Sequence, residues 1–139
     1  MEHLKIDSGA VTLAINGNEN RTITFYPTDV RFAEDFFGLA SSFMEKRKEC
    51  AAKSARLQGD ANAAAEELAM LRETYVFMRG EIDRVFGTGT SQTVFGNHDS
   101  LTAYIQFFHG LEPYVRKARQ NEIDRYLKGD SEEGAVMDA

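Results

Sequence analysis

The strongest constraint on the fold is a run of apolar residues between positions 61 and 85 that recur three and four positions apart. They are Ala61, Ala64, Leu68, Leu71, Tyr75, Met78, Ile82 and Val85. Such spacing places side chains on one stripe of an α-helix, and a stripe this regular is typical of a seam that packs against another helix. Met70 and Phe77 lie seven positions apart on another face. The sequence therefore predicts a long helix whose second apolar face packs within the fold or binds a partner.

The preceding segment supplies a helix to cover this seam. Its apolar residues recur at helical spacing, with two more that widen the stripe: Phe32, Phe36, Ala40 and Phe43, then Phe37 and Met44. Thr28 or Asp29, after Pro27, can cap the helix by accepting a hydrogen bond from a first-turn N–H. Gly59 and Asp60 predict where this helix ends and the next begins. Because the connection is so short, we expect an antiparallel helical hairpin.

The first 27 residues show the two-residue period of β-strands instead. Apolar residues alternate with polar ones on both sides of the turn-rich segment 16–20, namely Val11, Leu13 and Ile15 before it and Ile23 and Phe25 after it. This pattern predicts a β-hairpin. A third strand at Leu4–Ile6 would extend the hairpin into a short meander.

Residues 87–99 form a long connection rich in Gly, Thr and Ser, and loops of this kind tend to be functional or ordered by their own packing. Ser100 or Asp99 is expected to cap the next helix, which Gly110 and Pro113 kink or interrupt, since proline lacks the N–H that a helix needs. The apolar stripe of that helix begins with Leu101, Tyr104, Ile105, Phe108 and Leu111.

These patterns together predict an α+β, mainly α fold. An N-terminal β-hairpin or short meander precedes an antiparallel helical hairpin and a kinked C-terminal helical segment. At 139 residues the chain has the size of one domain. We expect a single globular domain over residues 1–128, with the hairpin in 1–27 and helices in 28–128. An acidic, flexible tail follows at 129–139.

Composition argues against several classes of function. The net charge of -6 makes DNA and RNA poor partners, since nucleic-acid affinity comes mainly from clustered Lys and Arg. The single cysteine, Cys50, cannot form an internal disulfide and has no neighbouring metal-ligand spacing. No apolar run approaches the ~18 residues of a membrane span, and the N-terminus lacks the apolar centre of a signal peptide. We expect a cytoplasmic protein that binds no nucleic acid, membrane, metal or cofactor.

No catalytic arrangement stands out, so we expect a binding protein rather than an enzyme. The Gly-rich connection lacks the Gly-Lys-Ser/Thr of a phosphate loop. His98 and Asp99 are adjacent in sequence, and adjacent side chains rarely point at each other. Most aromatic residues fit core stripes. The side chains that fit them least well, or that suit an adaptable surface, are the predicted partner-binding residues: Met70, Phe77, Phe95 and Phe107.

Three stretches carry a likeness to a known family: the hairpin that runs into 25–29 and a Phe-rich helix, residues 82–96 with their Phe-Gly-Thr-Gly-Thr-Ser-Gln segment, and residues 101–119. In these stretches the chain resembles the small tail assembly chaperones of long-tailed phages and of prophages of Gram-positive bacteria. The resemblance implies a protein that binds the tape measure protein, keeps it soluble and helps tail tube protein assemble around it, without catalysis or cofactor.

Two other roles remain open on the sequence. One is a structural component of the virion or of tail completion, and the other is a non-enzymatic adaptor that binds a host protein. Apolar residues on a second face of the helix at 61–85 also make a homo-oligomer plausible.

Overall fold

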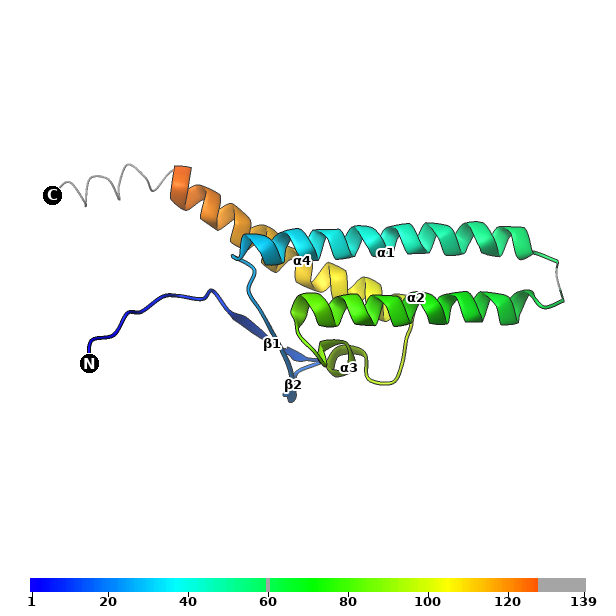
Figure 1. Ribbon diagram of the computed structural model, residues 1–139, viewed down its shortest axis with the longest axis horizontal. Helices are drawn as coiled ribbons and strands as arrows, with labels where there is room; N and C mark the ends of the chain where they lie inside the picture. Colours follow the sequence, from blue (N-terminus) through cyan, green and yellow to red (C-terminus); the bar gives the residue numbers. More distant parts are fainter. Residues whose placement is uncertain (60, 128–139) are drawn as a thin grey trace.

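A computed structural model describes residues 1–59 and 61–127 and shows two strands followed by four helices (Figure 1). The elements are β1 (Val11–Ile15), β2 (Asn18–Phe25), α1 (Val30–Leu57), α2 (Ala63–Phe86), α3 (Thr90–Phe95) and α4 (Leu101–Leu127). The α1–α2 pair forms a long antiparallel hairpin that α4 crosses, and the β-hairpin and α3 lie beside the last part of α2 (Figure 1). The predicted α+β, mainly α class is confirmed. Asp60 and the predicted tail at 129–139 lie outside the described residues.

The β-hairpin closes through a tighter turn than the sequence pattern predicts. Asn16 and Gly17 both have positive φ, 53° and 74°, and β2 already begins at Asn18. Two central residues with positive φ match the right-handed twist of paired strands, which explains the Asn-Gly pair here. Ile23 and Phe25 are 5% and 1% exposed. The hairpin therefore buries its apolar face against the helices.

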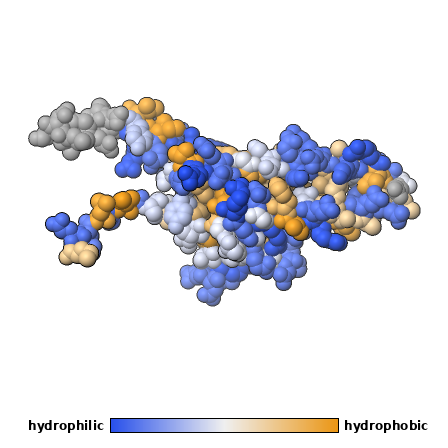
Figure 2. All heavy atoms as spheres, viewed as in Figure 1, coloured by the Kyte–Doolittle hydropathy of each residue, from blue (hydrophilic) through white to orange (hydrophobic). Residues whose placement is uncertain are grey.

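The predicted third strand at Leu4–Ile6 is wrong. Residues 1–10 form no strand, and Leu4 and Ile6 are 86% and 77% exposed. The backbone N–H of Gly9 donates to Asp7 Oδ1 at 2.9 Å, and Gly9 has a φ of 67°. This turn directs the preceding segment away from the hairpin, where Figure 2 shows its apolar side chains in orange against solvent.

The α1–α2 hairpin forms as predicted, but only part of its seam is covered. Asp29 caps α1 by accepting the Arg31 N–H at 3.0 Å. Of the seam residues on α2, Met78 and Ile82 are fully buried, whereas Leu68 is 63% exposed. Ala61 and Ala64 are also exposed. The prediction that α1 covers this seam is therefore wrong for its first half, where α1 contacts another side of α2 through the hydrogen bond from Ser54 to Glu67.

Helix α4 packs on the α1–α2 hairpin through aromatic rings. Tyr104 stacks with Phe43 of α1 at 5.8 Å between centroids and contacts Tyr75 of α2 at 4.8 Å. Ser100 caps the helix by accepting the Ala103 N–H at 3.2 Å.

The predicted interruption of α4 does not occur. The helix continues through Gly110 and Pro113. Its orange second half slopes away from the line of the yellow first half (Figure 1). A bend at this place fits the missing N–H of Pro113, which leaves the carbonyl of His109 without its helical donor.

Candidate functional site

An open apolar groove of about 310 Å³ lies between α1 and α4. Its floor consists of three buried rings, Phe36 and Phe43 from α1 and Phe108 from α4. The ring of Phe108 lies 6.1 Å from that of Phe36 and 5.3 Å from that of Phe43. Because the two helices meet through these large rings, their backbones stay apart and leave room for the groove between them.

The walls of the groove are apolar side chains that reach solvent. On α1, Phe37 is 39% exposed and Met44 is 51% exposed, and Ala40 lies between them half-buried. On α4, Ile105 is half-buried and also lines the groove. Phe37 and Met44 were expected to widen the core stripe of α1. The structure instead places them at the surface, where they form an apolar lining that no described element covers.

The two ends of the groove differ in charge. At one end Arg47 lies over the ring of Phe43, 5.9 Å from its centroid. No carboxylate forms an ion pair with Arg47 in the part of the chain that the structure describes. At the other end Glu112 lines the groove and pairs with Arg116, with His109 exposed beside it. The groove therefore runs from the Arg47 guanidinium at one end to an ion pair at the other.

A second hollow, of about 440 Å³, continues the surface past Arg47 toward the uncovered half of α2. Phe43 and Arg47 line both hollows, and Leu71 and Leu101 line the second one. Leu68 lies three positions before Leu71 on the same stripe of α2 and is exposed. The apolar surface of the site thus extends from the α1–α4 groove along the unpartnered start of the α2 seam.

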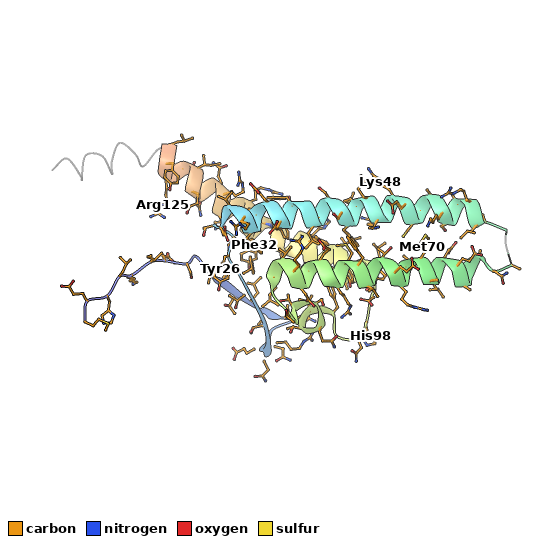
Figure 3. The ribbon with its side chains drawn as sticks, in the orientation of Figure 1. Tyr26, Phe32, Lys48, Met70, His98 and Arg125 are labelled. Atoms are coloured by element: carbon orange, nitrogen blue, oxygen red, sulfur yellow. The ribbon has the colours of Figure 1, made fainter. Side chains whose placement is uncertain are left out.

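The four partner-binding residues predicted from sequence do not share one surface. Phe95 and Phe107 are 8% and 7% exposed, and Phe95 stacks on Tyr104 with centroids 4.0 Å apart. Met70 is half-buried on the side of α2 toward α1 (Figure 3). Phe77 is 43% exposed beneath the ammonium of Lys46. In this conformation only Phe77 presents much of its side chain, and the partner-binding role of all four stays a prediction.

The groove residues themselves were missed, although the sequence carries a partial signal for them. Phe37 and Met44 lie to one side of the stripe formed by Phe32, Phe36 and Phe43. An apolar stripe wider than one neighbouring helix can cover is such a signal. Which edge of the stripe remains open depends on where α4 crosses α1, which the local pattern does not contain.

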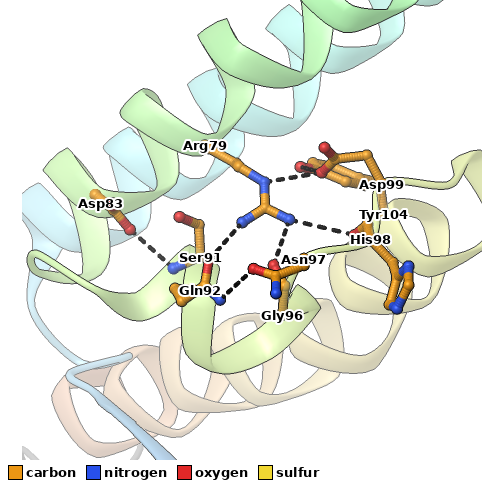
Figure 4. Close-up of polar contacts among 9 residues, drawn as sticks. All are labelled: Arg79, Asp83, Ser91, Gln92, Gly96, Asn97, His98, Asp99 and Tyr104. Atoms are coloured by element: carbon orange, nitrogen blue, oxygen red, sulfur yellow. Dashed lines mark hydrogen bonds and ion pairs between the residues drawn. The ribbon is translucent and has the colours of Figure 1, made fainter.

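The Gly-rich connection is held to α2 by one guanidinium (Figure 4). Arg79 Nε donates to Asp99 Oδ1 at 2.8 Å, and Nη2 donates to the carbonyls of Gly96 and His98 at 2.8 and 3.2 Å. Nη1 donates to Gln92 Oε1 at 3.3 Å. We call this set of bonds the Arg79 clasp. The predicted connection is therefore ordered by its own packing and contains the short helix α3.

Two further bonds extend the clasp into the core. The hydroxyl of Tyr104 donates to Asp99 Oδ1 at 2.8 Å, and Asp83 Oδ1 accepts the Ser91 N–H at 2.8 Å. Burial raises the pKa of Tyr104, and its hydrogen bond to the Asp99 carboxylate raises this pKa further. The polar groups of the clasp thus bind one another, which indicates a structural role.

His98 and Asp99 do not form a catalytic pair. The imidazole of His98 is exposed and points away from the Asp99 carboxylate (Figure 4). Across residues 1–59 and 61–127, no cluster of three or more His, Cys, Asp or Glu side chains is arranged to hold a metal ion. Within the same ranges, no helix combines the length and the apolar composition that crossing a membrane requires.

Comparison with known proteins places the chain in a family. No curated protein and no solved structure matches it. The model of DUF6673, described as a family of unknown function, matches residues 18–133. This range includes β2 and all four described helices, and therefore both the groove and the Arg79 clasp. The chain belongs to the DUF6673 family.

Proposed function

We propose that this protein is a chaperone that binds an amphipathic helix of a client protein in the α1–α4 groove. The observation that carries the proposal is an apolar lining of Phe37, Ala40, Met44 and Ile105 that is open to solvent along two helices. An amphipathic helix binds such a groove by placing apolar side chains three or four positions apart into it. Methionine in the wall suits varied clients because its unbranched side chain repacks easily.

The sequence resemblance indicates which client to test. Small tail assembly chaperones act on the tape measure protein and assist the tail tube protein, and the stretches that carry the likeness include the α1 and α4 segments that line the groove. We therefore propose the tape measure protein of a phage or prophage as the client, bound in the cytoplasm of the host cell. The proposal involves no chemical reaction and no cofactor.

The test is co-expression of the tagged protein with the neighbouring tail genes, followed by affinity purification and mass spectrometry. The groove variant is Met44→Glu, which places a charge in the apolar wall of the groove. Met44 is exposed on α1, so the variant is expected to fold. The matched control is Val76→Glu on α2, since Val76 is 66% exposed and lines neither hollow. Circular dichroism and a melting curve establish that both variants fold.

We expect the wild-type protein and Val76→Glu to recover the tape measure protein. Met44→Glu should recover at least roughly 10-fold less of it, because burying a carboxylate in an apolar contact is costly even beside Arg47. Recovery of no tail protein by the wild type would refute the proposed function. Full recovery by Met44→Glu would remove the groove as the site. A third variant, Phe77→Glu, tests the face predicted from sequence. If this variant alone failed to recover the tape measure protein, the binding site would lie on that face of α2.

A further inference from the structure

Arg47 occupies the junction of the two hollows, and its surroundings are mainly apolar. Its side chain is half-buried, its guanidinium lies over the Phe43 ring, and Nη1 approaches Met44 Sδ at 3.8 Å. The neighbouring basic side chains differ. Lys46 lies 3.8 Å from Glu49, and Lys48 points outward from α1 (Figure 3). Arg47 is thus the basic group of this run that faces the hollows.

The acidic groups around the hollows are already engaged by other cations. Asp99 lines the second hollow, and its Oδ1 binds Arg79 and Tyr104. Glu112 lines the far end of the groove and pairs with Arg116. A guanidinium partly removed from water favours an anionic partner, and its planar fork binds a carboxylate through two parallel hydrogen bonds. The adjacent start of α4 adds the positive end of a helix dipole at the same place.

We infer that the client helix carries an Asp or Glu within its apolar face and that this carboxylate pairs with Arg47. The inference rests on the proposed function, since it specifies the client of the same groove. Phe37 and Arg47 are ten positions apart on α1, about 15 Å, so the groove accommodates roughly three turns of a client helix. Apolar residues flank the carboxylate at three or four positions. Because Arg47 lies at one end of the groove, it orients the client with its acidic residue toward the start of α4.

The test measures binding of three designed peptides by fluorescence anisotropy. Each peptide is an amphipathic helix of about 18 residues, long enough to cover the three turns. They differ only at one central position of the apolar face, which is Glu, Gln or Lys. The proteins are the wild type, Arg47→Glu and Lys48→Glu. Lys48→Glu is the matched control, because it changes the charge in the same way as Arg47→Glu but at a side chain that points outward from α1.

We expect the wild-type protein and Lys48→Glu to bind the Glu peptide at least about 10-fold more tightly than the Lys peptide. Arg47→Glu should reverse this preference, and added salt should reduce it, since ions screen exposed pairs. If the wild type bound all three peptides equally, the inference about the carboxylate would be overturned. If Met44→Glu also failed to bind them, the groove would remain the helix-binding site. Binding of none of them would overturn the inference together with the groove proposal.

Discussion

Replacing Arg79 with Met should release the Gly-rich connection from α2. The substitution keeps an apolar side chain over α2 and removes all four hydrogen bonds that the guanidinium makes. Two of its bonds are short, those at 2.8 Å to Asp99 Oδ1 and to the Gly96 carbonyl. Hydrogen bonds with a charged partner contribute roughly 1.5–3 kcal/mol each. The Arg79 and Asp99 side chains are 20% and 34% exposed, so water replaces part of each bond and the lower figure applies.

The expected loss is therefore about 3 kcal/mol of unfolding free energy for the two bonds. For a chain of this size that corresponds to a fall in Tm of roughly 9 °C. Urea unfolding gives the free energy, and hydrogen exchange should show the largest loss of protection in the 90–98 segment. Arg72→Met is the matched control, because Arg72 is exposed on the same helix and no ion pair involves it among the described residues. Equal small losses in both variants would refute the structural role of the clasp.

Two further predictions concern the core. The pKa of Tyr104 is raised in the folded protein, so above about pH 10 the unfolded chain releases a proton that the folded chain keeps. This difference lowers the free energy of unfolding by up to roughly 1.4 kcal/mol per pH unit. Tyr104→Phe should therefore lose less stability than the wild type as the pH rises. Urea unfolding of both proteins between about pH 8 and 11 measures how the free energy of unfolding changes with pH. Identical pH dependence in the two proteins would contradict the raised pKa of Tyr104. Ile82→Ala should cost about 3–4 kcal/mol and Leu68→Ala under about 0.5 kcal/mol, because Ile82 is fully buried and Leu68 is exposed. A large loss for Leu68→Ala would show that another surface covers this half of the seam.

Local patterns in the sequence predicted the elements well because each element depends on its own residues. The alternation of apolar residues predicted both strands of the hairpin, and the Asn-Gly pair between them favours the two-residue turn that the structure has. The side chains of Asp29 and Ser100 accept first-turn N–H groups within their own helices. These hydrogen bonds join residues two or three positions apart, so they can be predicted from a short stretch of sequence.

The covering of each apolar face could not be predicted in the same way. The spacing of Leu68 and Ile82 is equally regular, yet Ile82 is fully buried and Leu68 is 63% exposed. The clasp has no local signal either, because Arg79 lies 13 to 20 positions from its partners. For the candidate site, the sequence indicated a second apolar face on the helices. It placed that face on α2, whereas the structure opens its groove between α1 and α4.

The missing N–H of Pro113 puts the most compliant point of α4 next to the groove. Ile105 and Phe108, before this point, form the groove wall and floor, whereas Val115, after it, is fully buried. The two halves of α4 are therefore anchored separately on either side of a hinge. Every α4 side chain that lines the groove precedes Pro113, so a change in the bend angle moves the second half of the helix and leaves the groove lining in place.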